Sequence, residues 1–464
     1  MSIPWRPWMA LAVLSFSSAL YAQLENETEL KLRAGGFMQD NPSLSPDGDE
    51  QRRASEFFGE IHGSLFTRYG SDIATKIRIQ AFSSTGEVFL NSDDTPKPSD
   101  GYIALREAWI DIGALTSFPG EVIRIGRQRI RQDDALWYDD DALGLEWSFD
   151  TTLLQWKLAA VQQVEGFRSD DADIENQQRD RPYFLASLGG QYRPNHFVGV
   201  RLAHAQDRFD LEDEDAEPAE ERRDRERRFT WAGVYLHNNY HDYRQIQHFG
   251  YWMELVNLRG DERVAERPAP GSGLPTTISE QDVDALAAVV AFRVRPRLET
   301  PFQFGAVYSH GEGGQDGATS RQYEQTGLHS NRARLTGTRT QIERFSGAAQ
   351  YQLNNLSALT GFIAFPGRRF ELSLLAHRFQ RVQAGAAVVA DGLSARPTAD
   401  DEDLGTAVDA VFSIYLDGFQ RTLIRDQGPA GEFRLRFSHF QPGAAYGPDA
   451  DASYRAILET SWRI

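Results

Sequence analysis

The feature that most limits how this chain can fold is an alternation of apolar and polar residues with a period of two. In GEFRLRFSHF (431–440), Phe433, Leu435 and Phe437 alternate with Arg434 and Arg436. Because successive side chains of a β-strand point to opposite faces, such a strand has one apolar face and one charged face. The charged face can meet water around a soluble β-sandwich or inside a membrane barrel, and this one segment allows both.

The same alternation recurs along the chain in runs of about ten residues, and no helical pattern of similar length competes with it. Examples are EFFGEIHGSLF (56–66), TKIRIQAF (75–82), the segment that begins at Asp284, and SYRAILETSWRI (453–464). Tight turns with Gly or Pro, at 68–72, 116–120, 193–196 and 365–369, alternate with long polar stretches. We expect the longest of these loops to run from about Ser309 to Gln341.

Short turns at one end and long loops at the other are typical of an up-and-down outer-membrane barrel. We therefore predict an all-β fold, a closed antiparallel transmembrane β-barrel of about 18 strands, located in the bacterial outer membrane. The sequence has no run of about 18 apolar residues and hence no candidate transmembrane helix. Five tryptophans near strand ends are expected in the aromatic girdles at the membrane surfaces: Trp109, Trp137, Trp147, Trp231 and Trp462.

Residues 1–22 have the pattern of a secretory signal peptide. Arg6 supplies the positive charge, an apolar run follows, and small residues lead to a cleavage site after Ala22. The alternative, an N-terminal anchor, has an apolar run too short to span a bilayer. We expect residues 23–464 to form a single barrel with long extracellular loops, and the absence of cysteine means that an exported chain needs no disulfide bonds.

Arginine makes up almost all of the basic residues of this acidic chain. The formal net charge is −18, which argues against a nucleic-acid partner. Only four of the 49 basic residues are lysines, which leaves 45 arginines. A guanidinium group binds carboxylates with two parallel hydrogen bonds and tolerates desolvation better than an ammonium group. An arginine-lined lumen would suit an acidic solute, but a GC-rich genome, or a lumen whose arginines only neutralise neighbouring acids, explains the same composition.

Three long segments resemble the bacterial outer-membrane alginate exporters, the AlgE family. They are GYIALREAWIDIGALTSFPGEVIRIGRQRIRQDDALWYDDDALGLEWSFDTTLL (101–154), YEQTGLHSNRARLTGTRTQIERF (323–345) and FQPGAAYGPDADAS (440–453). The resemblance implies an 18-stranded barrel that exports alginate, a linear polymer of uronic acids, through a narrow lumen lined by basic residues. It also implies a periplasmic polysaccharide-secretion complex as partner.

The resemblance also implies which residues line the pore. The basic pore positions of the family correspond to Arg106, Arg129, Arg332, Arg434 and Arg436, and Arg33 stands where the family has a lysine. His62 and Gln341 replace arginines of the family, and Asp139 and Asp170 match its acidic residues. The alternation itself places Arg434 and Arg436 in the lumen.

Two of these positions need an additional structural feature. Arg106 shares a face with apolar neighbours, so it can reach the lumen only through a β-bulge or from the rim. Arg332 lies in the longest loop and reaches the lumen only if that loop folds inward. Arg127, Arg129 and Arg131 share a face with Ile123 and Ile125, which leaves their orientation open.

The sequence therefore predicts an outer-membrane porin that exports an anionic, alginate-like exopolysaccharide. We expect a monomer that contacts outer-membrane lipid and lipopolysaccharide, with no catalytic residues, metal or cofactor. The nearest alternative is an anion-selective porin for the uptake of acidic oligosaccharides. A secreted polysaccharide-degrading β-rich enzyme and a purely structural membrane protein are further alternatives, although neither a solenoid repeat nor a catalytic motif is visible.

Overall fold

The computed structural model describes residues 24–46, 54–88, 99–116, 118, 120–170, 174, 176–212, 223–245, 247–267, 276–297, 301–419 and 429–464. The predicted signal peptide, with its cleavage site after Ala22, lies outside these residues. None of the helices in the described ranges is long and apolar enough to cross a membrane.

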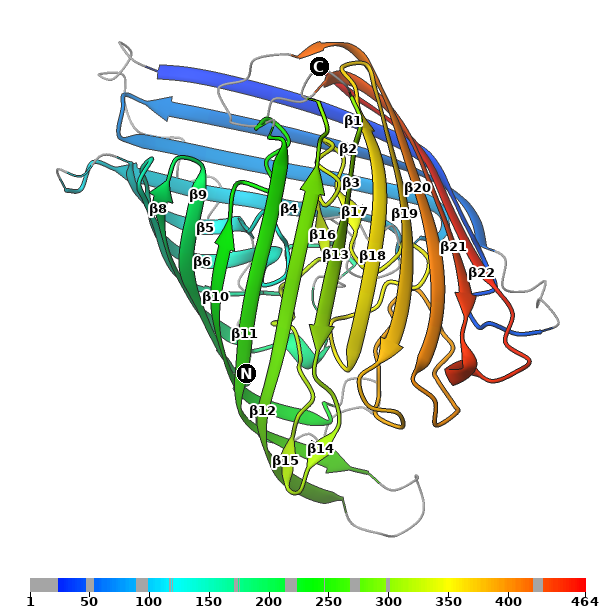
Figure 1. Ribbon diagram of the computed structural model, residues 1–464. Helices are drawn as coiled ribbons and strands as arrows, with labels where there is room; N and C mark the ends of the chain where they lie inside the picture. Colours follow the sequence, from blue (N-terminus) through cyan, green and yellow to red (C-terminus); the bar gives the residue numbers. More distant parts are fainter. Residues whose placement is uncertain are drawn as a thin grey trace.

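The strands form one closed antiparallel barrel, as the sequence predicts (Figure 1). The main sheet has twenty strands, and eighteen remain when the two-residue strands β14 (Gln315–Asp316) and β15 (Thr319–Ser320) are set aside. The first strand pairs with both the second and the last, Lys31 lying opposite Arg463 and Asp40 opposite Tyr454. This pairing closes the cylinder and leaves no free strand edge between the ends of the chain.

The eighteen long strands follow one another around the barrel in chain order. The first half contains β1 (Leu24–Asp40), β2 (Ala54–Tyr69), β3 (Ile73–Val88), β4 (Ser99–Gly113), β5 (Glu121–Arg131), β6 (Asp139–Asp150), β7 (Leu154–Gln162), β8 (Pro182–Arg193) and β9 (His196–Gln206). The second half contains β10 (Arg225–His237), β11 (Phe249–Glu266), β12 (Thr277–Val294), β13 (Gln303–Gly311), β18 (Leu356–Pro366), β19 (Phe370–Arg381), β20 (Asp403–Phe419), β21 (Pro429–Pro442) and β22 (Ser453–Arg463).

The connections alternate between short and long, as expected for an up-and-down barrel. Residues 70–72, 151–153, 194–195 and 367–369 are short turns at one end, and the long loops lie at the other. The longest connection within the described residues is 312–355 rather than 309–341, because β13 continues to Gly311 and β18 begins only at Leu356. We call residues 312–355 the inner loop.

The apolar face of each strand points outward and the polar face points into the barrel. In β2, Phe57 is 69% exposed and Ile61 is 50% exposed, whereas Glu60 and His62 are buried on the other face. A continuous exposed band of large apolar side chains is stable only in contact with lipid. The alternation of apolar and polar residues therefore separates the lipid-facing side of each strand from the lumen side.

The inner loop folds into the barrel and reaches almost from one end to the other (Figure 1). Near its start, Tyr138 at the head of β6 forms a bridge with Leu328. Further along, the Arg339 guanidinium donates to the carbonyl oxygen of Gly367 in a short turn at 2.9 Å. The loop then returns past β20 and β21 toward the long-loop end.

Apolar residues fix the inner loop against the wall. Leu335, Ile342 and Phe345 are at most 1% exposed and belong to one cluster with Trp231 of β10 and with Trp137 of the connection between β5 and β6. Each such side chain contributes about 1.5–3 kcal/mol when fully buried. The loop is therefore a packed part of the fold.

The prediction that five tryptophans lie in the aromatic girdles is wrong for three of them. Trp137 and Trp231 are 2% and 1% exposed and face inward, because the inner loop supplies an apolar surface inside the barrel. Trp109 also faces inward, because a bulge at Arg106 reverses the alternation in the rest of β4. Trp147, which makes an edge-to-face contact with Trp156, and Trp462, which is 45% exposed, lie on the outward face.

Candidate functional site

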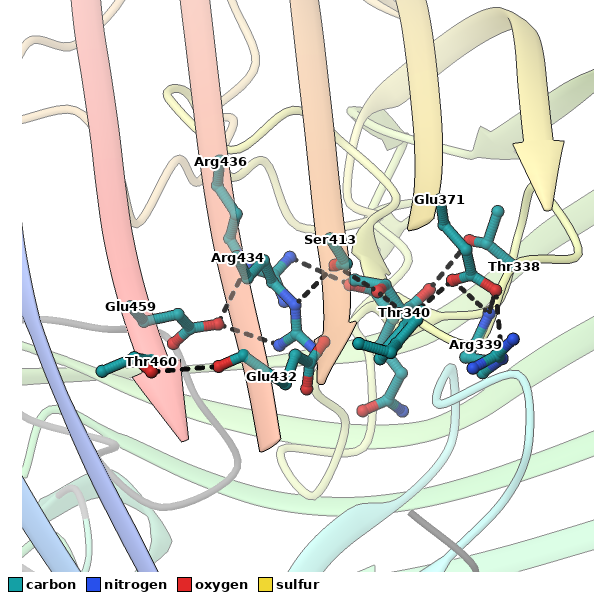
Figure 2. Close-up of polar contacts among 12 residues, drawn as sticks. Thr338, Arg339, Thr340, Glu371, Ser413, Glu432, Arg434, Arg436, Glu459 and Thr460 are labelled. Atoms are coloured by element: carbon teal, nitrogen blue, oxygen red, sulfur yellow. Dashed lines mark hydrogen bonds and ion pairs between the residues drawn. The ribbon is translucent and has the colours of Figure 1, made fainter. Parts of the chain in front are cut away.

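Strand β21 places two arginines in the lumen, as its alternation predicts. Leu435 and Phe437 are each 41% exposed on the outward face, and Arg434 and Arg436 point inward between them. Figure 2 shows Arg434 in contact with both neighbouring strands. Its guanidinium donates to Glu459 of β22 at 2.9 Å and to the Ser413 hydroxyl of β20 at 3.2 Å.

One carboxylate joins three of the lumen arginines. Glu459 accepts hydrogen bonds from Arg33 and Arg434, and its Oε1 lies 3.8 Å from Nε of Arg436. These residues belong to three adjacent strands, β21, β22 and β1, across the seam where the barrel closes. Because Glu459 is only 5% exposed, its charge is compensated by the guanidinium groups and not by water.

The same network continues onto β2. Arg33 donates to Glu60 at 2.9 Å, and Glu60 also contacts the imidazole of His62. The amide of Gln80 in β3 donates to the same carboxylate at 3.1 Å. His62 thus faces the lumen within a polar cluster that extends over five strands.

Arg106 reaches the lumen through a β-bulge, one of the two explanations that the sequence left open. Arg78 pairs with Glu107 and Ile79 with Leu105, so Arg106 is the extra residue of the bulge. Both Arg106 and Glu107 are buried inside the barrel. Arg106 Nε lies 2.7 Å from Asp141 Oδ2. The bulge therefore adds one inward-facing cation to this wall.

Arg129 lies against Asp139 at the start of β6. Its Nε and Nη2 donate to Asp139 Oδ1 at 3.0 and 2.7 Å, and the hydroxyl of Ser330 in the inner loop donates to Oδ2 at 2.8 Å. Ile125 is 44% exposed whereas Arg127 is buried, and Gly126 between them has a φ of 129°. In a regular strand, Ile125 and Arg127 would lie on the same face. The positive φ of Gly126, which glycine adopts readily, coincides with the point where the strand changes faces.

Asp170, one of the acidic residues that the resemblance indicates, forms an ion pair with an arginine of its own segment. Its two carboxylate oxygens accept from the neighbouring Arg168, which lies over the ring of Tyr102 at 3.8 Å. Arg168 in turn forms a bridge with Ala104 of β4. Asp170 therefore fixes the segment that follows β7 against the inner surface of β4.

Arg332 and Gln341 are brought to β21 by the inner loop. Arg332 Nε lies 3.1 Å from Glu343 Oε1 within the small hairpin of β16 (Arg332–Ala333) and β17 (Ile342–Glu343). Arg436 donates to the carbonyl oxygen of Gln341 at 2.9 Å. Burial raises the pKa of Glu343 to about 7, although Arg332 acts in the opposite direction.

The predicted basic residues are charge-compensated in this structure. Arg33, Arg106, Arg129, Arg332, Arg434 and Arg436 each lie within 4 Å of at least one carboxylate. Arg332 and Arg436, together with Glu343 and Arg455, border a cavity of about 40 Å³. A cavity needs about 10–15 Å³ to hold one water molecule, so this one has room for only a few.

Sequence reasoning missed a second set of lumen arginines on the opposite wall. Arg225 and Arg227 open β10, and both contact Glu324 of the inner loop. Arg201 of β9 contacts Asp134 and Glu254 at 2.6 and 2.9 Å. The alternation of RERRF (225–229) contains this signal, since Arg225, Arg227 and Phe229 share one face.

The comparisons with known proteins agree with this fold and with one family. The family model described as "Alginate export" matches residues 16–458. The "Alginate production protein AlgE" of Pseudomonas aeruginosa is 32% identical over 396 residues, which are 82% of this chain and 79% of that protein. The protein of the same name from Pseudomonas syringae pv. tomato is 29% identical over 96% of this chain and 92% of its own length.

Solved structures of outer-membrane proteins share the fold at low sequence identity. OpdK of Pseudomonas aeruginosa has a TM-score of 0.54 at 12% identity and covers 95% of this chain and 98% of its own. OccAB1 of Acinetobacter baumannii has the same TM-score at 8% identity, with 95% and 97% covered. Together with the matching family model, these findings show that the chain belongs to the alginate export family of bacterial outer-membrane β-barrels.

Proposed function

We propose that this protein is a porin that exports an anionic exopolysaccharide, an alginate-like polyuronate, and that the arginines of its lumen bind the carboxylates of the passing polymer. The observation that carries the proposal is the sharing of Glu459 among Arg33, Arg434 and Arg436. A carboxylate held by several guanidinium groups marks a position where another carboxylate can be bound. Membership of the alginate export family supports a uronic acid polymer as the source of that carboxylate.

Exchange of partners explains how such a lumen can conduct a polyanion. A uronate carboxylate has the same hydrogen-bonding chemistry as a glutamate side chain, so it can replace Glu459 or Glu60 beside an arginine. Guanidinium groups offset the loss of hydration that the polymer undergoes on entering a narrow space. Each water-accessible contact contributes on the order of 1 kcal/mol, so several contacts in series bind the chain without trapping it.

We infer that the inner loop closes the channel in the structure described here and that transport requires it to move. The cavity of about 40 Å³ between the loop and β21 is far too small for a sugar ring. Several contacts between the loop and strands β19 and β20 are pairs of hydroxyl groups, such as Thr340 with Ser413 at 3.0 Å and Thr336 with Ser373 at 2.9 Å. Water can replace contacts of this kind when the loop leaves the wall.

The remaining parts of the proposal concern the chain as a whole. We propose residues 1–22 as the signal peptide that directs it to the outer membrane, and a periplasmic polysaccharide-secretion complex as the supplier of polymer. Closure of the barrel within a single chain supports a monomer as the transporting unit. The proposal gives the protein a transport role and no catalytic step.

The test combines channel recording with secretion. Uronate oligomers should block single channels in planar bilayers, whereas neutral oligosaccharides of the same length should not. In a strain that lacks the gene, the polymer should accumulate in the periplasm, and the wild-type chain should restore its release. Arg434→Gln with Arg436→Gln should weaken the block several-fold, and Arg378→Gln, on the outward face of β19, should leave it unchanged.

Two results would contradict the proposal. Equal block by neutral oligomers would show that the lumen does not recognise carboxylates. Normal release of polymer without the gene, together with impaired growth on acidic oligosaccharides, would identify an uptake porin instead.

A further inference from the structure

The outward face of the barrel has a hollow of about 500 Å³ over β7 to β12. Its lining belongs mainly to two neighbouring rows of outward side chains that cross these strands. One row consists of Leu158, Ala186, Leu202, Ala232, Asn257 and Leu286, which lie opposite one another in register. The row below contributes Trp156, Leu188, Val200, Val234 and Leu255.

The hollow results from the alternation of large and small residues in the first row. Ala186 lies between Leu158 and Leu202, and Ala232 lies between Leu202 and Asn257. The surrounding side chains stand out from the wall, since Val234 is 54% exposed and Leu255 50%. The two alanines therefore form an apolar floor with aliphatic walls.

Polar residues lie directly on the long-loop side of the hollow. The next row contains His204, Thr230, Arg259 and Asp284 in register. The side chain of Arg259 is 73% exposed, and its Nε lies 3.5 Å from Asp284. The Asn257 amide donates to the same carboxylate at 3.0 Å, and Nη1 of Arg321 from the inner loop lies 3.7 Å from it. Arg321 also contacts Asp316 at 3.6 Å.

Aromatic residues mark the opposite boundary of the apolar band. The Tyr251 hydroxyl contacts His196 at 2.7 Å and Tyr192 at 3.0 Å near the short turns. Tyr251 and Arg259 are eight residues apart on β11, which is roughly 26 Å along the tilted strand. The hollow lies next to the Arg259 row, in the half of the band that faces the long loops, which is the outer leaflet of an outer membrane.

We propose that this hollow binds an acyl chain of lipopolysaccharide and that Arg259, with Arg321 beside it, binds a phosphate group of the same molecule. A lipid chain fills an apolar depression within the hydrocarbon band, because the side chains that line an empty depression would lose van der Waals contacts on one side. An exposed guanidinium at the end of the depression complements a phosphate. Asp284 orients Arg259 from the side and leaves its outward donors to the lipid.

The test measures lipid retention by the barrel extracted from outer membranes. Native mass spectrometry of the detergent-solubilised protein should show one retained lipid A moiety, and titration with lipid A and with phosphatidylethanolamine compares their affinities. Ala232→Phe fills the hollow, and Arg259→Gln removes the cation. Ala376→Phe and Arg378→Gln, both on the outward face of β19, are the matched controls.

Ala232→Phe should reduce lipid A retention about ten-fold, which corresponds to the loss of roughly two buried methylene groups. Arg259→Gln should weaken lipid A about five-fold, the size of one exposed charged contact, with no change for phosphatidylethanolamine. Both controls should retain lipid A as the wild type does. Ala186→Leu replaces Ala232→Phe if the latter does not give a heat-modifiable, folded band.

Three results would overturn the proposal. Unchanged lipid A retention in the filled variants would show that the hollow is not its site. Equal affinity for phosphatidylethanolamine, with no effect of Arg259→Gln, would exclude a phosphate-specific site for lipopolysaccharide. A dimer mass that Ala232→Phe converts to monomer would identify a second copy of the chain as the occupant.

Discussion

At the residue scale, Glu459 determines the charge balance of the lumen. It is 5% exposed and contacts arginines from β1 and from β21, so its negative charge lies between three positive ones. Figure 2 shows the contacts of Glu459 with Arg434 and Arg436. Removing a buried carboxylate leaves its guanidinium partners without compensation, a change that affects both function and stability. Glu459 therefore allows a sharper test of the lumen than any single arginine does.

Glu459→Gln should increase the anion selectivity of the channel and lower the free energy of unfolding by about 3 kcal/mol. The selectivity should rise because Arg33, Arg434 and Arg436 then face the lumen with one negative charge fewer. Reversal potentials in a salt gradient and urea unfolding of the purified barrel measure the two effects. Arg434→Gln removes a positive charge, so it is the control that should lower the anion selectivity. A Glu459→Gln channel that became more selective for cations would contradict the exchange mechanism.

Glu343 should make the inner loop sensitive to pH. Its pKa is raised by burial to about 7, so the buried position favours the neutral carboxyl. The stabilisation of the inward-packed loop is complete below the ordinary glutamate pKa and is lost as the pH rises through 7. Conductance should therefore increase between pH 6 and pH 8.

Glu343→Gln should remove this step, because the amide cannot ionise. Single-channel recordings of both proteins across that pH range provide the measurement. A step of equal size in Glu343→Gln would assign the pH dependence to another group.

At the scale of elements, the inner loop is the part of the fold that the sequence predicted least completely. The alternation predicted the barrel, its strand number and the inward orientation of Arg434 and Arg436, because a period of two follows directly from strand geometry. It could not show how deeply residues 312–355 enter, because the loop has no periodicity and its position depends on contacts with distant strands such as that of Thr340 with Ser413. A resemblance to a family was needed to place Arg332.

Local irregularities account for the other differences. The bulge at Arg106 turns Glu107 and Trp109 inward, and nothing in LREAW distinguishes it from a regular strand. Arg225 and Arg227 directly follow a long stretch of acidic and basic residues, so the sequence does not show where β10 begins. Both cases show that side-chain alternation fixes a face only when the strand boundaries and register are known.

A disulfide bond between the inner loop and β21 should close the channel reversibly. The hydroxyls of Ser346 and Ser438 are 3.0 Å apart, and the chain has no native cysteine to interfere. Oxidised Ser346→Cys/Ser438→Cys should lose conductance and polymer release, and a reducing agent should restore both. Ser346→Cys alone is the control, and full conductance of the oxidised double variant would show that the loop does not have to leave β21.

At the scale of the whole molecule, the barrel depends on the seam between its first and last strands. Gly35 lies at this seam, where a Cβ atom would come within 2.3 Å of the Leu458 carbonyl oxygen and 2.7 Å of the Phe58 ring. Gly63 on β2 faces outward, and a Cβ atom there would meet nothing within 4 Å. The two glycines therefore form a matched pair for testing closure.

Gly35→Ala should destabilise the folded barrel by about 1–3 kcal/mol, the usual cost of crowding a packed site, whereas Gly63→Ala should change it little. The fraction of heat-modifiable barrel after refolding into detergent, followed in increasing urea, gives both values. Equal stability of the two variants would show that the strands at the seam can separate without loss of the fold.

The shared carboxylate at the seam has a consequence for the thermodynamics of transport. Each uronate carboxylate would displace a protein carboxylate from the arginines and would leave again when the polymer advances by one sugar. The protein carboxylate then returns, and its return releases the free energy that its displacement required. A pathway of that kind has a nearly level profile and no preferred direction. The free energy that gives the transport a direction then has to come from outside the barrel.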